Sequence, residues 1–166
     1  MAENPPPIGV NLVFFDGEDQ GVPGVNETYC QGSRFFAKNL PIPRPDEAIN
    51  LDMVGDKQLV LPIERYSLEY HPQLVRHLWD RAKEMGLDAF IGRVDYAIYD
   101  DHIPLNEIAG IPSIDLIDFK YPNSYANFWH TLNDIPENCS EESLGQVGDL
   151  MVDYIYNREE QNRSEN

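Results

Sequence analysis

Acidic side chains follow the apolar run at residues 11–15, and they could take part in metal or proton chemistry. The run ends in a group of acids that includes Glu18 and Asp19, whose side chains leave the end of a predicted strand in different directions. Open α/β sheets bind ligands at the carboxyl edge of their strands. One acid there could bind a cation while its neighbour transfers protons, and His130 could bind the same cation.

Further acids and histidines lie at or near the ends of predicted strands. A zinc site uses carboxylate and imidazole ligands and leaves one position open for substrate. The sequence contains no His-Glu-x-x-His helix and no Cys-x-x-Cys pair, so spacing alone leaves two interpretations open: a metal site, or acids that cap structural elements. The candidates are Glu18, Asp19, Asp52, Asp101, His102 and His130.

Some candidates also have a purely structural interpretation. From the residues alone, His102 is better explained as a structural histidine held by backbone hydrogen bonds than as a ligand. Trp129 belongs to the core or to a pocket wall. Cys30 and Cys139 are too few for a disulfide framework; they pair only if their backbones approach, and two free thiols are the alternative.

The charge of the chain bounds its partners. Its 29 acidic and 12 basic residues give a formal charge of −17, which argues against nucleic acids and anionic membrane surfaces, because both bind basic patches. No apolar stretch approaches the ~20 residues of a membrane-spanning helix, and no basic-then-apolar signal peptide opens the sequence. Hydrophobic residues make up 42% of the chain, enough for a packed core.

Strands that alternate with helices must position these residues. Apolar runs indicate strands and apolar residues at 3.6-residue spacing indicate helices, in which His71 and His77 are expected to face solvent and Leu144 to face the core. This alternation predicts one α/β domain, a three-layer sandwich with a mostly parallel central sheet. The predicted strands cover residues 10–15, 48–54, 58–63 and 113–117; the predicted helices cover 28–39, 71–85 and the segment after Ser140; 101–107 is a loop or helical turn, and 158–166 a frayed polar tail.

Four segments of the sequence occur together, in this order, in one enzyme family. They are Phe14–Asp19, Asn50–Gly55, Asp100–Pro112 and Phe128–Asp134. With them the chain resembles the zinc-dependent glutaminyl-peptide cyclotransferases (glutaminyl cyclases) of the animal and bacterial kind, in the superfamily of the co-catalytic zinc aminopeptidases. The resemblance covers about residues 10–156. It implies the superfamily's fold, incomplete at the N-terminus, so that residues 1–166 are the C-terminal portion of a larger catalytic domain and residues 1–7 a lead-in.

The resemblance assigns a role to each candidate near the proton-transfer site. Glu18 resembles the family's general acid/base. Asp52 and Asp101 resemble two carboxylates that hydrogen-bond around it. Trp129 resembles the aromatic wall of the substrate pocket, to which we also assign His102.

The resemblance also implies zinc. His130 aligns with the family's zinc-binding histidine, and Asp19 stands where the family usually has a glutamate, with a reach one methylene shorter. The family's first zinc-binding aspartate lies in an upstream Gly/Ser-rich segment, which we expect to precede residue 1. Because catalytic zinc normally has three protein ligands, we expect the 166-residue chain alone to bind zinc weakly and to turn over little. Tight stoichiometric binding in a zinc titration of this chain would contradict that expectation.

The implied reaction is the cyclisation of an N-terminal glutamine to pyroglutamate with release of ammonia, on peptide or protein N-termini and with one zinc ion. Two alternatives stay open: an aminopeptidase with two zinc ions, the second bound by Asp52, and a non-catalytic or catalytically deficient α/β module. The segment Asp100–Pro104 and the tryptophan before His130 favour the cyclase. Relatives of this family are often exported, and the compartment of this chain stays open.

Overall fold

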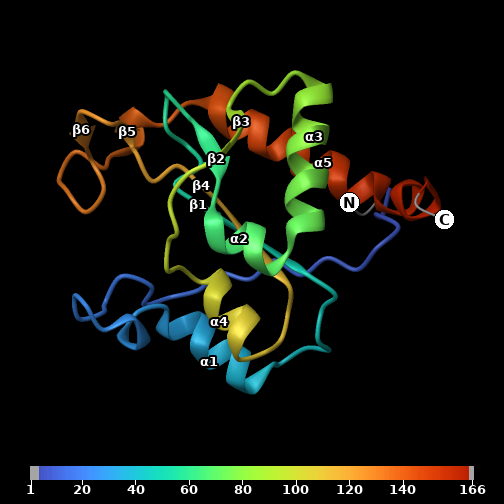
Figure 1. Ribbon diagram of the computed structural model, residues 1–166, viewed down its shortest axis with the longest axis horizontal. Coiled ribbons are helices and arrows are strands. Elements are labelled where there is room, and N and C mark those ends of the chain that lie inside the picture. The colour runs from blue at the N-terminus through green and yellow to red at the C-terminus, as the bar shows by residue number, and fades with distance from the viewer. Residues whose placement is uncertain (1–3, 165–166) are drawn as a thin grey trace.

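The computed structural model describes the backbone of residues 4–164 and the side chains of residues 4–157. A long extended segment leads into strands and helices that alternate along the chain (Figure 1). The strands are β1 (Ala48–Asp52), β2 (Leu61–Ile63), β3 (Phe90–Val94), β4 (Ser113–Ile117), β5 (Pro122–Asn123) and β6 (Ala126–Asn127). The α-helices are α1 (Gln31–Asn39), α2 (Arg65–Tyr70), α3 (Pro72–Met85), α4 (His102–Glu107) and α5 (Glu141–Ser164), with 3-10 turns at Asn26–Thr28 and Pro136–Asn138.

The longer strands form parallel pairs. β1 pairs with β4 in one unbroken register, and β2 pairs with β3. β2 also lies next to β4, so the two pairs are neighbours, while β5 and β6 form a short antiparallel hairpin. The prediction of an α/β fold with parallel strands is confirmed, with ladders that join the described strands in pairs.

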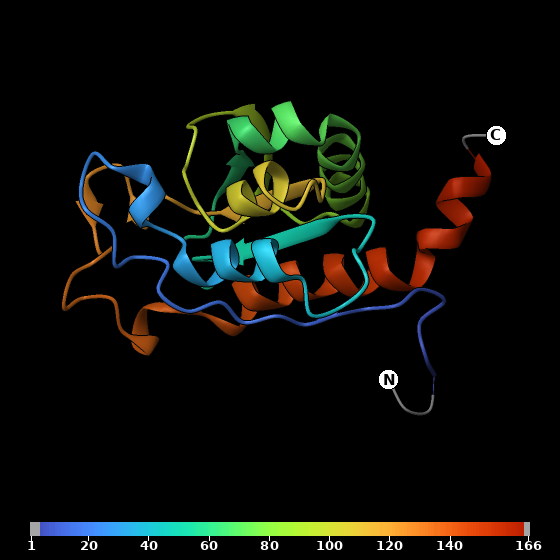
Figure 2. The same ribbon diagram turned by 90° about the horizontal axis from the view of Figure 1, so that it is seen from below.

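Helices lie on both sides of the strands. Figure 2 shows α2, α3 and α4 on one side of β1, and α5 with the N-terminal segment on the other. Every residue of β4 is buried, as is typical of a parallel strand that is covered on both faces. Among the described residues, no helix is both long enough and apolar enough to span a membrane.

The helix α3 supplies much of the hydrophobic core. Pro72 occupies its first turn, where its missing N–H leaves no hydrogen bond unmade. Gly86 ends it with φ +73°, a left-handed conformation that glycine adopts without strain. The buried residues of α3, which confirm the predicted spacing, are Leu74, Val75, Leu78, Trp79 and Ala82.

Replacement of Leu78 by alanine is expected to lower the free energy of unfolding by about 2–5 kcal/mol, because a buried leucine leaves a cavity. Leu78 is fully buried in a cluster that also contains residues of β2, β4 and α5. Urea denaturation measures the change. Val152→Ala is the matched control: Val152 is 56% exposed on α5, and its replacement should change stability by less than about 0.5 kcal/mol. Equal losses in both variants would contradict this account of the core.

The prediction of a buried strand at residues 10–15 is wrong. This segment is extended but has no ladder, and Leu12 and Phe14 are 77% and 93% exposed. A strand is stabilised by the partner that takes its N–H and C=O groups. Within the described residues no strand lies beside this segment, so its apolar character alone does not make it one.

Other local predictions need smaller corrections. The strand predicted at 58–63 begins only at Leu61, because Asp118 binds the backbone N–H of Val60 (2.9 Å) ahead of it. Leu144 is 51% exposed, since Ser143 and Val147 face the core in the first turns of α5.

The two histidines of the α3 region are half-buried instead of facing solvent. His71 Nε2 lies 3.3 Å from Glu47 Oε2, and the ring of His77 packs on Tyr154 with 5.7 Å between centroids. The polar tail predicted at 158–166 is helical as far as Ser164. Residues 165–166 of that tail and 1–3 of the predicted lead-in lie outside the described residues.

Candidate functional site

The first turn of α1 holds the acidic segment that contains Glu18. The first N–H groups of a helix have no partner within the helix and therefore bind other acceptors. A Cβ atom on Gly32 would lie 2.5 Å from Asp16 O, so only glycine permits this close approach. The hydrogen bonds run from Cys30 N to Glu18 O (2.9 Å), from Gln31 N to Gly17 O (3.1 Å) and from Gly32 N to Asp16 O (2.9 Å).

The start of α4 brings two buried carboxyl groups to the same place. Asp101 Oδ1 accepts a hydrogen bond from Ser33 Oγ of α1 at 2.6 Å. Asp100 turns the other way: its Oδ1 accepts from Asp101 N at 2.5 Å, and its Oδ2 accepts from Asn50 Nδ2 at 3.0 Å. Asp52 ends β1 beside them, and its carboxyl interacts with those of Asp100 and Asp101. We call Glu18, Asp52, Asp100 and Asp101 the acid cluster.

The acid cluster raises the pKa of its members. Burial, followed by the charges of Asp52, Asp101 and Asp19, raises the pKa of Glu18 to about 7. Burial and the neighbouring Asp52 carboxylate raise the pKa of Asp100 to about 8. Burial also raises the pKa of Asp52 and of Asp101. A carboxyl group with a pKa near 7 both accepts and donates protons at neutral pH.

Cys30 lies against the acid cluster. It is fully buried, and its sulfur lies within 4.8 Å of possible ligand oxygens of Glu18 and Asp100, which are themselves equally close to each other. Burial, and then the charge of Asp101, raises the pKa of the Cys30 thiol well above its ordinary value, so it stays protonated at neutral pH. Both cysteines are free: Cys139 is exposed, and the disulfide that the sequence left open does not form.

The two predicted zinc ligands of this chain lie on exposed segments. Asp19 is close enough to Glu18 to contribute to its raised pKa. His130 stacks on Trp129 with 4.0 Å between ring centroids and has a φ of +57°. Asp134, in the same loop, lies near enough to the acid cluster to affect Asp52. Burial contributes most to the raised pKa of Asp52, and the charge of Asp134 adds to it. Asp19 and His130 stay predicted ligands.

His102 does not line a surface pocket, which corrects its assignment to the substrate pocket. It is fully buried, and its ring nitrogens face Glu64 and Asp115, which are also fully buried. It follows Asp101 on a helical turn, so it points into the core while Asp101 faces Ser33. His102 therefore lies in the core, and its ring nitrogens face carboxylates and not the backbone groups that the sequence predicted.

Sequence reasoning missed several members of the site. The pair Asp100-Asp101 was visible, but a sequence does not show which of two adjacent acids faces Asp52. Nothing in the sequence around Cys30 indicates that its side chain lies against the acid cluster. Glu64 is the N-cap of α2, and the sequence gives little signal for it, because Ser, Thr, Asp and Asn are the usual residues at this position.

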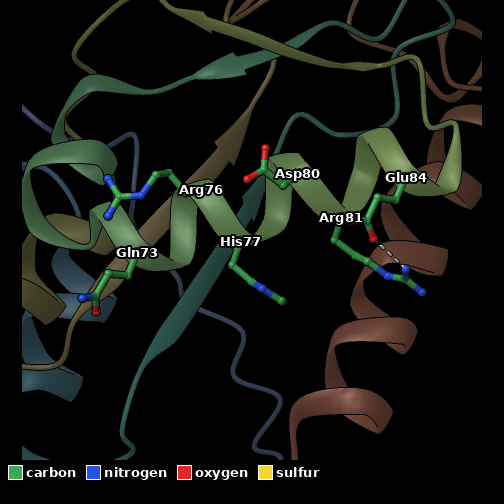
Figure 3. Close-up of a pocket in the computed structure, with 6 residues that line it drawn as sticks. All are labelled: Gln73, Arg76, His77, Asp80, Arg81 and Glu84. Carbon is green, nitrogen blue, oxygen red and sulfur yellow. Dashed lines mark hydrogen bonds and ion pairs between the residues drawn. The ribbon is translucent and has the colours of Figure 1, made fainter. Parts of the chain in front are cut away.

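A shallow pocket lies along the outer face of α3, away from the acid cluster (Figure 3). Charged side chains line it, among them Arg81, which binds Glu84 at 3.0 Å. None of the predicted site residues lines this pocket. It is therefore not the candidate site.

The family of the chain follows from comparison with known proteins. Residues 1–155 match the model of peptidase family M28. The chain belongs to peptidase family M28. It is 24% identical in sequence to a glutaminyl-peptide cyclotransferase of Boiga dendrophila, over 89% of this chain and 45% of that protein. The chain thus spans about half the length of the curated relatives it matches.

Solved M28-like structures share the fold closely. The glutaminyl cyclase of Tannerella forsythia matches with a TM-score of 0.85 at 35% identity, over 92% of this chain and 56% of that chain. A Zn-dependent exopeptidase from Parabacteroides distasonis matches with a TM-score of 0.80 at 34% identity, over 87% of this chain and 53% of that chain. A leucine aminopeptidase precursor from Bacteroides thetaiotaomicron matches with a TM-score of 0.80 at 33% identity, over 87% of this chain and 51% of that chain, so the similar structures include both a cyclase and an aminopeptidase by name.

Proposed function

We propose that this chain supplies the proton-transfer site of a zinc-dependent glutaminyl-peptide cyclotransferase. The proposed substrates are peptides or proteins with an N-terminal glutamine, which is converted to pyroglutamate with release of ammonia. The observation that carries the proposal is the half-buried carboxyl of Glu18, whose pKa lies at about 7 among other acids. The similarity to glutaminyl cyclases over most of the chain supports it.

Glu18 moves the proton in this reaction. Its carboxylate takes a proton from the α-ammonium group of the substrate, and the freed amine attacks the γ-carbonyl carbon. The bond from that carbon to the α-nitrogen forms and the bond to the amide nitrogen breaks. Of the two protons that the α-nitrogen loses, one passes through Glu18 to the departing nitrogen. The other proton is released to solvent. The product ammonia leaves the site and is protonated to ammonium at neutral pH.

The neighbouring carboxyl groups keep Glu18 suited to this task. Burial contributes most to the raised pKa of Glu18, and the charges of Asp52 and Asp101 contribute next. Together they match the proton affinity of Glu18 to neutral pH. Ser33 fixes Asp101, and the backbone of α1 fixes Glu18. Both groups are thus attached to the same helix, α1.

The donor set of the site fits zinc. Carboxylate and imidazole groups are ligands that zinc prefers, and Asp19 and His130 offer one of each on exposed segments. Asp19 and His130 are the proposed ligands in this chain. Zinc, when bound, supplies Lewis-acid polarisation of the γ-carbonyl oxygen. One ion is sufficient for this reaction, because no water molecule attacks.

Trp129 is the proposed wall of the substrate pocket. It is 38% exposed, and its ring is held between His130 and Phe119, with 5.2 Å between the centroids of Trp129 and Phe119. Phe119 also lines a hollow with Tyr96 and Lys120. The ring therefore has a fixed orientation and a free part that the apolar stem of a glutamine side chain can contact.

An aminopeptidase is the second candidate, because a leucine aminopeptidase precursor is nearly as similar to this chain as the glutaminyl cyclase of Tannerella forsythia is. In that reaction Glu18 would activate a water molecule and Asp52 would bind a second zinc ion. The full-length protein, loaded with zinc, separates the two when it is given the glutaminyl and leucyl amides of the same chromogenic amine.

The products of that assay decide between the reactions. A cyclase releases ammonia from the glutaminyl amide, leaves the chromogenic amine attached and holds one zinc ion. An aminopeptidase releases the amine from the leucyl amide and holds two. Release of the amine without ammonia would overturn the cyclase proposal, and the absence of both products would identify a catalytically deficient protein.

A further inference from the structure

Three ionisable side chains form a fully buried group beneath the acid cluster. Glu64, His102 and Asp115 are each 0% exposed and come from the N-cap of α2, from α4 and from β4. His102 Nε2 lies 3.4 Å from Glu64 Oε2, and His102 Nδ1 lies 3.9 Å from Asp115 Oδ2. We call these three residues the buried triad. Ionisable groups are rarely buried completely, so the triad needs a physical explanation.

Glu64 anchors the buried triad. Burial acts to raise its pKa, but the neighbouring His102 imidazole and hydrogen bonds from backbone N–H groups outweigh burial and lower it, so the group stays charged. Ser67 links it to the next member, because Ser67 Oγ donates to Glu64 Oε2 at 2.8 Å and accepts from Asp115 N at 2.8 Å. The backbone donors to Glu64 are Tyr66 N (3.0 Å), Ser67 N (2.6 Å) and Ile98 N (2.9 Å).

Asn50 joins the buried triad to the acid cluster. In the parallel ladder of β1 and β4, Asn50 is the Cα partner of Asp115, so the two side chains leave the same face of the sheet. Asn50 Nδ2 donates to Asp115 Oδ1 at 3.1 Å and to Asp100 Oδ2 at 3.0 Å. The two N–H groups of one neutral amide therefore serve two buried carboxyl groups, one in the triad and one in the cluster.

We propose that Asn50 is a positioning residue that fixes the carboxyl of Asp100 within the acid cluster, and that the buried triad holds Asn50 in place. This inference rests on the proposed function, because it assigns Asn50 a part in proton transfer through Asp100. In the chain of contacts from Glu64 to Asp100, Asn50 is half-buried and the other side chains are buried. A carboxyl oxygen of Asp100 in turn lies within 4.8 Å of one of Glu18.

The first test measures turnover of a glutaminyl substrate by the full-length protein. Asn50→Leu keeps the size of the side chain and removes both donors, and we expect it to lower kcat at least tenfold while KM changes less than twofold. Asn106→Leu is the matched control. Asn106 is also half-buried, but its amide binds only the backbone, at His102 O and Ser113 O (2.9 Å each).

Both variants are expected to lower Tm, but only Asn50→Leu should lower kcat. If both lower kcat equally, or if Asn50→Leu keeps the wild-type kcat, the inference is overturned. Asn50→Ser keeps one donor and replaces Asn50→Leu if the latter does not fold; it should give an intermediate kcat.

The second test does not depend on activity. Hydrogen exchange of side-chain amides, followed by NMR, should show the Nδ2 protons of Asn50 exchanging at least tenfold more slowly than those of the exposed Asn133. Asp115→Leu, which removes the acceptor of Asn50 Nδ2, should abolish most of that protection. Exchange of Asn50 as fast as Asn133 would overturn the inference. If the wild-type protein does not turn over glutaminyl substrates, the proposed function fails, and the exchange rates still decide whether the triad holds Asn50.

Discussion

Replacement of Glu18 by glutamine is expected to lower kcat for a glutaminyl substrate by at least about 100-fold, because general acid–base catalysis contributes about 10²–10⁴ in rate. The amide has the shape of the carboxyl group but takes up no proton. The backbone bond from Cys30 N to Glu18 O and the packing of the segment on α1 do not involve the side chain. KM should therefore change little, and Tm should not fall. Steady-state kinetics with the zinc-loaded, full-length protein measure the effect.

Glu27→Gln is the control for this prediction. Glu27 is exposed in the turn that precedes α1, a few residues from Cys30, and it lies outside the acid cluster. Its replacement removes the same charge from the same part of the chain, so kcat should stay within twofold of the wild-type value. Unchanged turnover in Glu18→Gln would show that Glu18 is not the proton shuttle, and the cyclase mechanism proposed above would be wrong.

The free energy of unfolding of the metal-free protein is expected to rise as the pH falls from 8 to 5. The pKa values of Glu18, Asp100 and Asp118 are raised by burial to about 7, 8 and 6. Over this range the folded state binds protons that the unfolded state has lost, so stability falls as the pH rises. Each unit of pKa difference corresponds to about 1.4 kcal/mol for one buried group. We expect a gain of at least about 2 kcal/mol in urea denaturation with a chelator present.

Asp100→Asn tests the origin of this dependence. The variant removes the group with the highest of these pKa values, so its stability at pH 8 should exceed that of the wild type, and its slope between pH 6 and 8 should be smaller. Below about pH 4 the free energy of unfolding is expected to fall as the pH falls. The reason is that three carboxyl groups with lowered pKa values then become protonated: Glu64, Asp95 and Asp153. A wild-type stability that rises steadily from pH 5 to 8 would contradict the prediction.

The elements that the sequence predicted correctly are those whose local pattern agrees with their packing. The spacing from Leu74 to Ala82 and the glycine at position 86 define α3 without further information. The apolar run Ser113–Ile117 is long enough for one buried strand and bounded by turns. Residues 10–15 carry the same kind of pattern and form no strand, because pairing depends on a partner elsewhere in space.

The site was predictable only in outline. Glu18, Asp52 and Asp101 do lie together with the start of α1. The direction of each side chain depends on tertiary contacts, and this is why Asp100 was overlooked and His102 was placed in the pocket. The register that sets Asn50 opposite Asp115 is a property of two strands that lie more than sixty residues apart in the sequence.

The hydrogen bonds that attach residues 16–18 to the first turn of α1 allow opening of the site to be measured without any ligand. The amide hydrogens of Cys30, Gln31 and Gly32 point at this segment and not into the helix. Deuterium uptake at these three positions therefore reports how often the segment that carries Glu18 detaches from α1. Uptake further along α1 reports fraying of the helix itself. Comparing the two rates gives a local opening equilibrium for the site, independent of substrate.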